Sequence, residues 1–290
     1  MNETYDPKTI KFPYTKITDQ HYLIVKKNDG TVFDEDFPYI DHSKSFNRKR
    51  TWFRLFIKAI VIPVVYVRLG LRIKGRENIK KNKDLLKNGV VSICNHIHLW
   101  DYLCIMHGIR PFVSNVVVWA PNLRGENKTI IRLVGGIPVP DSSFKATMAF
   151  NEAIGDYLSK GGWLHIYPEG SMWEYYKPIR PFKKGFAYYA IKYDKPVIPL
   201  AISYRKPSWI RRKIFHQEAT FTLNIGEPIF RNKELDRNEQ EIDLMKRCHE
   251  AVSILSGSDP KDNIYPPIFN NNERVDYYTD TYGVGYKGSH

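Results

Sequence analysis

From residue 88 to residue 255 the chain alternates between short apolar runs and longer amphipathic stretches. The runs have the length of buried strands, and the stretches have the period of helices packed on one side. Strands that alternate with helices are typical of an α/β fold, in which helices flank a mostly parallel central sheet. The pattern predicts strands at 90–94, 116–119, 137–139, 163–167, 197–203 and 220–225, and helices at 101–107, 129–134, 144–159, 186–193 and 237–255.

Two polar segments flank this domain. In residues 1–41, the runs at 22–25 and 31–33 lie on either side of Asn28-Asp29-Gly30, a pattern that predicts a β-hairpin. Residues 256–290 are rich in Asn, Tyr, Asp and Gly, and predict either a disordered tail or an arm laid over the domain. We therefore expect the α/β domain to occupy 88–255, with a separate basic region at 42–87.

The basic region carries fourteen Lys or Arg and only two acidic residues, a local net charge of +12. Within it, 52–62 predicts a helix on which Arg54 and Lys58 form a narrow polar stripe beside a wide apolar face. Basic residues around an aromatic, apolar helix favour a membrane anchor that lies in the plane of the interface. The alternative is a helix packed on the core, with its basic residues solvated.

The whole chain has 44 Lys and Arg against 31 Asp and Glu, which favours a polyanionic partner: nucleic acid, an anionic membrane surface or a phosphorylated substrate. Because no nucleic-acid-binding module accompanies the charge, we expect no nucleic acid partner. Three cysteines and no signal-peptide pattern favour a reducing, intracellular compartment. No charge-free run exceeds thirteen residues, so we expect a peripheral or monotopic protein on the cytoplasmic side of a membrane.

The first candidate site follows the strand that ends at Cys94, in the run Asn95-His96-Ile97-His98-Leu99-Trp100-Asp101. Asp101, at the start of a helix, can accept from one ring nitrogen of His96 and leave the other as a general base. His96, His98 and Asp101 also resemble part of the His-x-His-x-Asp-His signature of metallo-β-lactamase-type hydrolases. That signature fails at Trp100 and Tyr102, so the metal-dependent hydrolase is the second choice.

A second candidate site follows the strand 163–167, where Pro168 precedes Glu169, Gly170 and Ser171. This turn places a carboxylate and backbone N–H groups at the same edge of the sheet as His96. The basic residues that follow could hold a phosphate; they are Arg180, Lys183 and Lys184. The chain has no Gly-x-Ser-x-Gly elbow, P-loop, Gly-x-Gly-x-x-Gly or Cys-x-x-Cys motif, which disfavours serine hydrolases, nucleotide kinases, dinucleotide enzymes and zinc ribbons.

In this order the motifs resemble the glycerolipid acyltransferase family, whose best-known members are lysophosphatidic-acid acyltransferases. Asn95, His96 and Asp101 match the family's first motif, Asn-His followed by four residues and Asp. The run 167–171, Tyr-Pro-Glu-Gly-Ser, matches the third motif, Phe-Pro-Glu-Gly-Thr, and 195–199 resembles the fourth. The resemblance covers about residues 70–230.

The resemblance implies a mechanism without metal or cofactor. His96, oriented by Asp101, removes a proton from an acceptor hydroxyl, which attacks the thioester of acyl-CoA or acyl carrier protein directly. Glu169 and Gly170 help to place the acceptor. The implied activity is O-acylation of a lysophospholipid such as 1-acylglycerol-3-phosphate. A basic membrane-binding module without catalysis remains the alternative outside enzymes.

The chain departs from the family at its second motif. The family places an Arg after this strand to bind the acceptor phosphate, whereas here the strand leads to Asp141 and no Arg follows. Lys145, Arg124 or Arg180 are candidates to replace it. His98 also stands where Ser is usual. The acceptor therefore stays open between lysophosphatidate, another lysolipid and a glycolipid hydroxyl.

Overall fold

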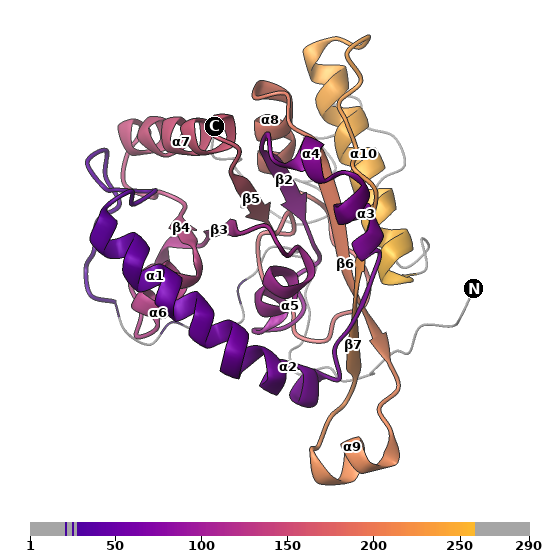
Figure 1. Cartoon of the computed structure of the whole chain (residues 1–290). Helices are drawn as coiled ribbons and strands as arrows, with labels where there is room; N and C mark the ends of the chain where they lie inside the picture. Colours follow the sequence, from indigo (N-terminus) through magenta and orange to yellow (C-terminus); the bar gives the residue numbers. More distant parts are fainter. Residues whose placement is uncertain (1–20, 22–24, 26–27, 259–290) are drawn as a thin grey trace.

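The computed structural model describes residues 21, 25 and 28–258. The described residues form one seven-stranded sheet with helices on both faces (Figure 1). The predicted α/β fold with a mostly parallel sheet is confirmed, because every neighbouring pair of strands is parallel except β6 and β7. The strands, in spatial order, are β1 (Arg72–Lys74), β7 (Thr220–Ile225), β6 (Val197–Arg205), β2 (Val90–Ile93), β5 (Trp163–Ile166), β3 (Ser114–Val118) and β4 (Gly136–Pro138).

The helices divide between the two faces of the sheet. The helical elements are α1 (Lys44–Phe56), a π-helical turn η1 (Ile57–Val61), α2 (Ile62–Leu69), α3 (Arg76–Lys81), α4 (Lys83–Leu86), α5 (Asp101–Gly108), a 3₁₀ turn η2 (Ala120–Leu123), α6 (Lys128–Val134), α7 (Phe144–Ser159), α8 (Gly185–Lys192), α9 (Trp209–Ile214) and α10 (Arg237–Ser256). Side chains of α7, α8 and α10 share one hydrophobic core, and side chains of α2, α3, α4 and α5 share the other.

Strand β2 shows how the sequence pattern produces these two cores. Its side chains alternate between the faces of the sheet, so that Val91 and Ile93 join the first core while Val90 and Cys94 join the second. All four are buried, as expected for a strand covered by helices on both sides. The carboxyl ends of β2, β5 and β3 therefore meet at one edge of the sheet, where a site can form.

The basic region is divided in the structure. Residues 44–69 form one continuous helical rod. Ser43 caps its N-terminus, where Ser43 Oγ accepts from Phe46 N, and Gly70 in the left-handed conformation caps its C-terminus. The π-helical turn lies just before Pro63, which has no backbone N–H to donate. Residues 72–86, expected in the same region, instead contribute β1, α3 and α4 to the α/β domain.

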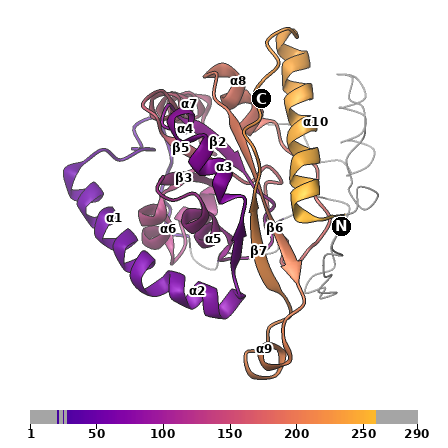
Figure 2. The same ribbon diagram turned by 45° about the vertical axis from the view of Figure 1, so that its right-hand side comes forward.

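Arg54 and Lys58, predicted to form one polar stripe on this helix, have different environments: Lys58 is exposed, whereas Arg54 is partly buried. Its guanidinium points into the protein and donates to the carbonyl oxygens of Ser114 (2.9 Å) and Val134 (3.0 Å). Burial lowers the pKa of Arg54 to about 10. The opposite face of the rod is exposed and largely apolar; its exposed side chains include Trp52, Leu55, Phe56, Ile60, Val64 and Val67. Figures 1 and 2 show this rod along the outside of the molecule.

The predicted N-terminal hairpin lies partly outside the described residues, which include Val25 but not Tyr22, Leu23 or Ile24. Its second half is wrong, because 28–33 forms no strand. There, Asn28 and Asp29 accept from the backbone N–H groups two residues ahead, and Asp29 N donates to Arg124 O. These local bonds hold the backbone in turns. The C-terminal tail, 259–290, also lies outside the described residues.

Buried histidines predict a loss of stability in acid. Burial lowers the pKa of His165 to about 3 and of His249 to about 4, from an ordinary value of 6.5. The unfolded chain therefore takes up protons below about pH 6.5 that the folded chain does not, so the free energy of unfolding decreases as the pH falls. His165 alone accounts for about 2 kcal/mol at about pH 5.

Urea unfolding at about pH 7.5 and about pH 5 measures this decrease. His165→Gln should flatten the pH dependence, whereas the control substitution of the exposed His42 by Gln should leave it unchanged. Equal slopes for the wild type and His165→Gln would contradict the assignment.

Candidate active site

The loop that leaves β2 is fixed to the neighbouring strand by Asn95. Its side chain is buried, donates to Ile202 O (3.0 Å) and accepts from Ile202 N (2.8 Å) on β6. Asn95 therefore continues the pairing of β2 with β6 by side-chain bonds after the strand itself has ended. The next residue, His96, begins the loop that crosses the carboxyl edge of the sheet.

His96 and Asp101 are brought together as the sequence predicts. His96 Nδ1 lies 2.7 Å from Asp101 Oδ2, and the imidazole is 24% exposed while the carboxylate is 1% exposed. Asp101 is the first residue of α5, where the helix dipole favours a negative charge. Because the carboxylate of Asp101 can only accept, His96 carries its hydrogen on Nδ1. The lone pair then lies on Nε2, which can accept a proton.

Two buried carboxylates hold three consecutive backbone N–H groups of this loop. Glu169 Oε2 accepts from His96 N (3.1 Å), and Asp101 Oδ2 accepts from Ile97 N (3.2 Å) and His98 N (3.4 Å). A carboxylate that accepts backbone N–H groups in a buried site is stabilised in its ionised form. The conformation of this loop therefore depends on Asp101, the same carboxylate that bonds the His96 ring, and on Glu169.

Tyr167 supplies a further partner that sequence reasoning missed. Its hydroxyl donates to Asp101 Oδ1 (2.6 Å), and its ring stacks on the His96 imidazole with centroids 3.8 Å apart. Burial would raise the pKa of Asp101, but His96 and Tyr167 together hold it below its ordinary value. The sequence did contain a signal for this contact. Position 167 is Tyr where the third motif of the family has Phe, which adds one hydroxyl.

Glu169 is held by Arg180. Both side chains are buried, and Arg180 Nη2 donates to Glu169 Oε2 (2.7 Å) while Arg180 N donates to Oε1 (3.1 Å). The same guanidinium donates to Ser171 Oγ (2.7 Å) and lies over the Trp173 ring, 4.5 Å from its centroid. Glu169, Ser171 and Arg180, predicted as substrate-binding residues, are thus joined to one another beneath the surface.

The segment after Ser171 returns to the His96 loop and closes it. Trp173 N donates to His96 O and Tyr175 N donates to Ile97 O, each at 3.0 Å. Both sides of the His96 backbone are therefore bonded, its N–H to Glu169 and its carbonyl to the 173–175 segment.

Gly170, Lys183 and Lys184 lie at the surface side of this arrangement. Gly170 has a φ of +79°, a backbone conformation that favours glycine, and the end of the Lys183 side chain lies beside it. Lys183 N donates to Pro168 O (2.7 Å), and Lys184 is exposed at the start of α8. These residues place positive charge beside the Gly170 turn.

The residues considered as replacements for the second-motif Arg have different environments. Arg124 donates to both oxygens of Asp141 at 2.6 Å and to Thr31 O at 2.7 Å, so its guanidinium is already engaged. Arg180 is engaged with Glu169, as described above. Lys145 is exposed on α7.

The cysteines and the possible metal ligands near His96 have environments that the structure describes. Burial raises the pKa of Cys94 and Cys104, both fully buried, so these thiols stay protonated. Among residues 28–258, no three His, Cys, Asp or Glu side chains converge to hold a metal ion. His98, proposed as a second ligand, instead accepts from Trp100 N at its Nδ1 (3.0 Å), which fixes the turn before α5.

Comparison with known proteins finds a family model and two relatives that are similar to this chain. Residues 70–203 match the family model described as Acyltransferase. The 1-acyl-sn-glycerol-3-phosphate acyltransferase of Cocos nucifera is 25% identical over 169 residues, which are 57% of this chain and 52% of that protein. The chain thus spans about half the length of that curated relative. The crystal structure of the 1-acyl-sn-glycerophosphate acyltransferase PlsC from Thermotoga maritima has a TM-score of 0.47 and 20% identity, covering 77% of this chain and 85% of that one.

Removal of the Glu169 charge should destabilise the fold. Glu169→Gln keeps the size of the side chain but leaves the buried guanidinium of Arg180 without its carboxylate, and we expect a loss of about 3 kcal/mol or more in the free energy of unfolding. The matched control is Glu227→Gln, which removes an exposed pair with Lys81 and should cost less than about 1 kcal/mol. Similar losses for the two variants in urea unfolding would show that the buried pair has no special structural role.

Proposed function

We propose that this protein is an O-acyltransferase that modifies a glycerolipid at a membrane surface; the match of residues 70–203 to the acyltransferase family model supports this proposal. It transfers a fatty acyl chain from acyl-CoA or acyl carrier protein to the hydroxyl of a lysophospholipid, of which 1-acylglycerol-3-phosphate is the first candidate. The thioester is a co-substrate, and no metal or other cofactor takes part.

The observation that carries this proposal is the 2.7 Å bond between His96 Nδ1 and Asp101, with the imidazole partly open to solvent. His96 Nε2 takes the proton from the hydroxyl of the lipid acceptor. At the same time, the oxygen of that hydroxyl attacks the carbonyl carbon of the thioester. The tetrahedral intermediate collapses with cleavage of the C–S bond, and the leaving thiolate receives the proton back from His96. Asp101 stabilises the imidazolium that exists between the two proton transfers.

Direct transfer agrees with the nucleophiles near His96. Cys94, two residues before it, is a buried and protonated thiol. The hydroxyl of Ser171 is buried and accepts from Arg180, and the hydroxyl of Tyr167 donates to Asp101. None of these groups is activated as a nucleophile, so the acceptor hydroxyl itself attacks.

The acceptor is placed by the turn after β5. Glu169, Ser171 and Arg180 act on it through the backbone that they hold, because all three side chains are buried. Lys183, whose side chain lies beside Gly170, and the exposed Lys184 supply positive charge for a phosphate on the acceptor. Arg124 is engaged with Asp141 through both its terminal nitrogens, so Lys183, Lys184 and the exposed Lys145 are the candidates to replace the missing second-motif Arg.

The protein reaches its lipid acceptor through the helical rod 44–69. Arg50 and Arg54 face the protein, and the exposed face presents Trp52, Ile60 and Val64. Such a face suits the boundary between head groups and acyl chains. None of the helices within residues 28–258 is both long enough and apolar enough to cross a bilayer. The exposed apolar face of the rod supports peripheral or monotopic binding, which we propose takes place on the cytoplasmic side, as expected from the sequence.

A panel assay on the purified protein tests the proposal. A long-chain acyl-CoA or acyl carrier protein is offered with lysophosphatidate, other lysophospholipids and monoacyl glycolipids, and the lipid products are followed by mass spectrometry. His96→Ala should lower the acylation rate by a factor of about 10² to 10⁴, because it removes the general base. Product formation that survives His96→Ala would contradict the mechanism, and binding to vesicles without any product would favour a non-catalytic module. Activity that needs stoichiometric zinc would favour the hydrolase.

Tyr167→Phe should lower kcat about tenfold with little change in KM, since the hydroxyl supports Asp101 and not the substrate. Loss of this donor also raises the pKa of Asp101 toward its ordinary value, so the loss of activity on the acid side begins at a higher pH.

The matched control for that variant is Tyr157→Phe, which removes a hydroxyl bonded to Trp163 O at the opposite end of β5. The control should change neither kcat nor the pH profile. Equal effects of both substitutions would show that Tyr167 has only a structural role.

A further inference from the structure

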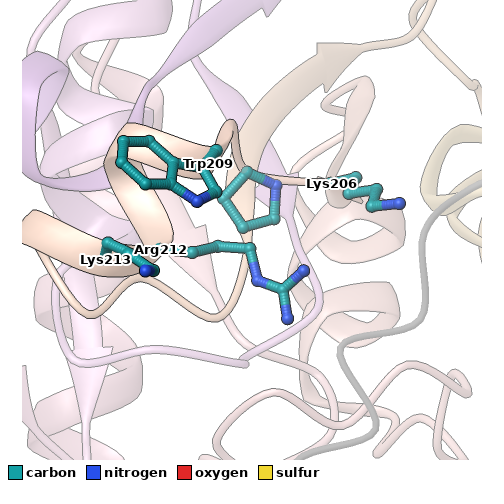
Figure 3. Close-up of a pocket in the computed structure, with 5 residues that line it drawn as sticks. Lys206, Trp209, Arg212 and Lys213 are labelled. Atoms are coloured by element: carbon teal, nitrogen blue, oxygen red, sulfur yellow. The ribbon is translucent and has the colours of Figure 1, made fainter.

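The hairpin between β6 and β7 ends in an exposed helix that the proposed chemistry does not use. This tip, residues 206–217, contains α9, and its Trp209 and Ile214 side chains are 67% and 64% exposed. Lys206, Pro207, Trp209, Arg212 and Lys213 line an open hollow of about 540 Å³. Figure 3 shows Trp209, Arg212 and Lys213 together on one side of the hollow, with Lys206 on the other.

The tip carries only positive charge. Between residues 206 and 217 the sequence has four basic residues and no acidic one. Lys213 Nζ lies over the Trp209 ring, 5.1 Å from its centroid, which keeps an ammonium group beside the indole. A lone basic loop would be solvated, but here exposed Trp209, Ile210, Ile214 and Phe215 are interleaved with the charges. Indole and basic side chains together favour the polar boundary of an anionic bilayer.

The tip lies at the same end of the molecule as His96. Pro199 of β6 pairs with Ile93, the last residue of β2, and β6 continues to Arg205. Six further residues carry the hairpin about 20 Å past the end of β2, in the direction in which His96 follows that strand. Figures 1 and 2 show α9 at the far end of this hairpin, next to the end of α2.

Several hydrogen bonds fix the tip to the helical rod. Arg211 Nη1 donates to Val67 O (2.7 Å), Gln217 Nε2 donates to Val67 O (3.2 Å), and Arg68 Nη1 donates to Phe215 O (3.5 Å). The rod's exposed apolar face and the tip are thus parts of one rigid end of the protein.

We propose that this tip is a second membrane-binding site, in which the hollow holds the phosphate of an anionic phospholipid and Trp209 and Ile214 enter the head-group layer. With the exposed face of the rod as the first contact, a second contact beyond its C-terminal end limits rotation about the rod axis, so that the carboxyl edge with His96 faces the bilayer. The benefit of this orientation rests on the proposed function, because it serves acyl transfer to a lipid. Binding of lipid by the tip does not itself require acyl transfer.

An anionic bilayer fits the tip better than an acidic protein such as acyl carrier protein does. Contacts to an acidic helix would engage the charges, but the protruding Ile210 and Ile214 side chains would stay in water. Nucleic acid would leave the same aliphatic groups uncovered. A bilayer takes up both kinds of group at once, with the phosphates at Arg212 and Lys213 and the aliphatic groups beneath them.

Vesicle binding by the full chain tests the site. The double substitution Arg212→Gln/Lys213→Gln should weaken binding to vesicles of phosphatidylcholine with phosphatidylglycerol about 30-fold, which corresponds to about 1 kcal/mol for each charge. Binding to phosphatidylcholine alone should not change. The control Lys80→Gln/Lys246→Gln removes two exposed charges from α3 and α10, away from the tip, and should weaken binding to a lesser extent. Equal weakening by the two double variants would overturn the proposal.

A second measurement identifies the contact itself. Quenching of tryptophan fluorescence by bromine-labelled acyl chains should decrease in Trp209→Phe and, separately, in Trp52→Phe, because both indoles enter the bilayer. A decrease in Trp52→Phe alone would overturn the site while leaving the rod as a membrane contact. Binding of acyl carrier protein that is lost in Arg212→Gln/Lys213→Gln, with unchanged vesicle binding, would also overturn it in favour of the carrier protein.

Failure of this site and failure of the proposed function give different results. Acylation of a short-chain acceptor dissolved as monomers requires His96 but no bilayer, so it should be normal in Arg212→Gln/Lys213→Gln. His96→Ala should abolish that acylation and leave vesicle binding unchanged.

Discussion

The site depends on two buried carboxylates that hold one loop. Asp101 and Glu169 accept the three consecutive backbone N–H groups of His96, Ile97 and His98. A buried carboxylate is costly unless it is fully bonded, and each of these has its own additional partner: Tyr167 and the imidazole for Asp101, Arg180 for Glu169. The imidazole is therefore positioned by its backbone as well as by its ring.

This constraint explains why motifs far apart in the sequence occur together. Asn95 ties the loop to β6, Glu169 ties it to the turn after β5, and the 173–175 segment pairs with its carbonyl groups. A change in any of these would move His96 relative to Asp101, and small displacements of a catalytic base are costly. Glu169 therefore acts on the position of His96 through the loop that it holds.

The architecture also relates the site to its substrate. The carboxyl ends of β2 and β5 point toward the end of the molecule where α2 ends and α9 lies, as Figure 1 shows. A lipid acceptor remains in the bilayer, so a base that must reach its hydroxyl has to face that surface. In the orientation that we propose, the rod and the tip contact the bilayer together, and the tip limits rotation of the protein about the axis of the rod.

The sequence predicted six of the seven strands, the main helices and the pairing of His96 with Asp101, because these follow from hydrophobic period and from the position of His96 at a strand end. It did not predict β1, α3 and α4, which lie in the basic region that was expected to be separate from the domain. Arg54 has the spacing of a polar stripe with Lys58, but it faces inward because the carbonyl groups of Ser114 and Val134 lie there. The helix α9 has only six residues, too few to show a helical period, and the roles of Tyr167 and Arg180 depend on contacts that only the folded chain brings together.

In the mechanism that we propose, His96 activates the acceptor hydroxyl for direct attack on the thioester. Intact-protein mass spectrometry after rapid mixing with a long-chain acyl-CoA, first alone and then with the acceptor, separates direct transfer from an acyl-enzyme. Direct transfer leaves the mass of the protein unchanged at all times, and thiol is released only when the acceptor is present. A protein whose mass increases by one acyl chain before the acceptor is added, and returns to its starting value afterwards, would contradict it.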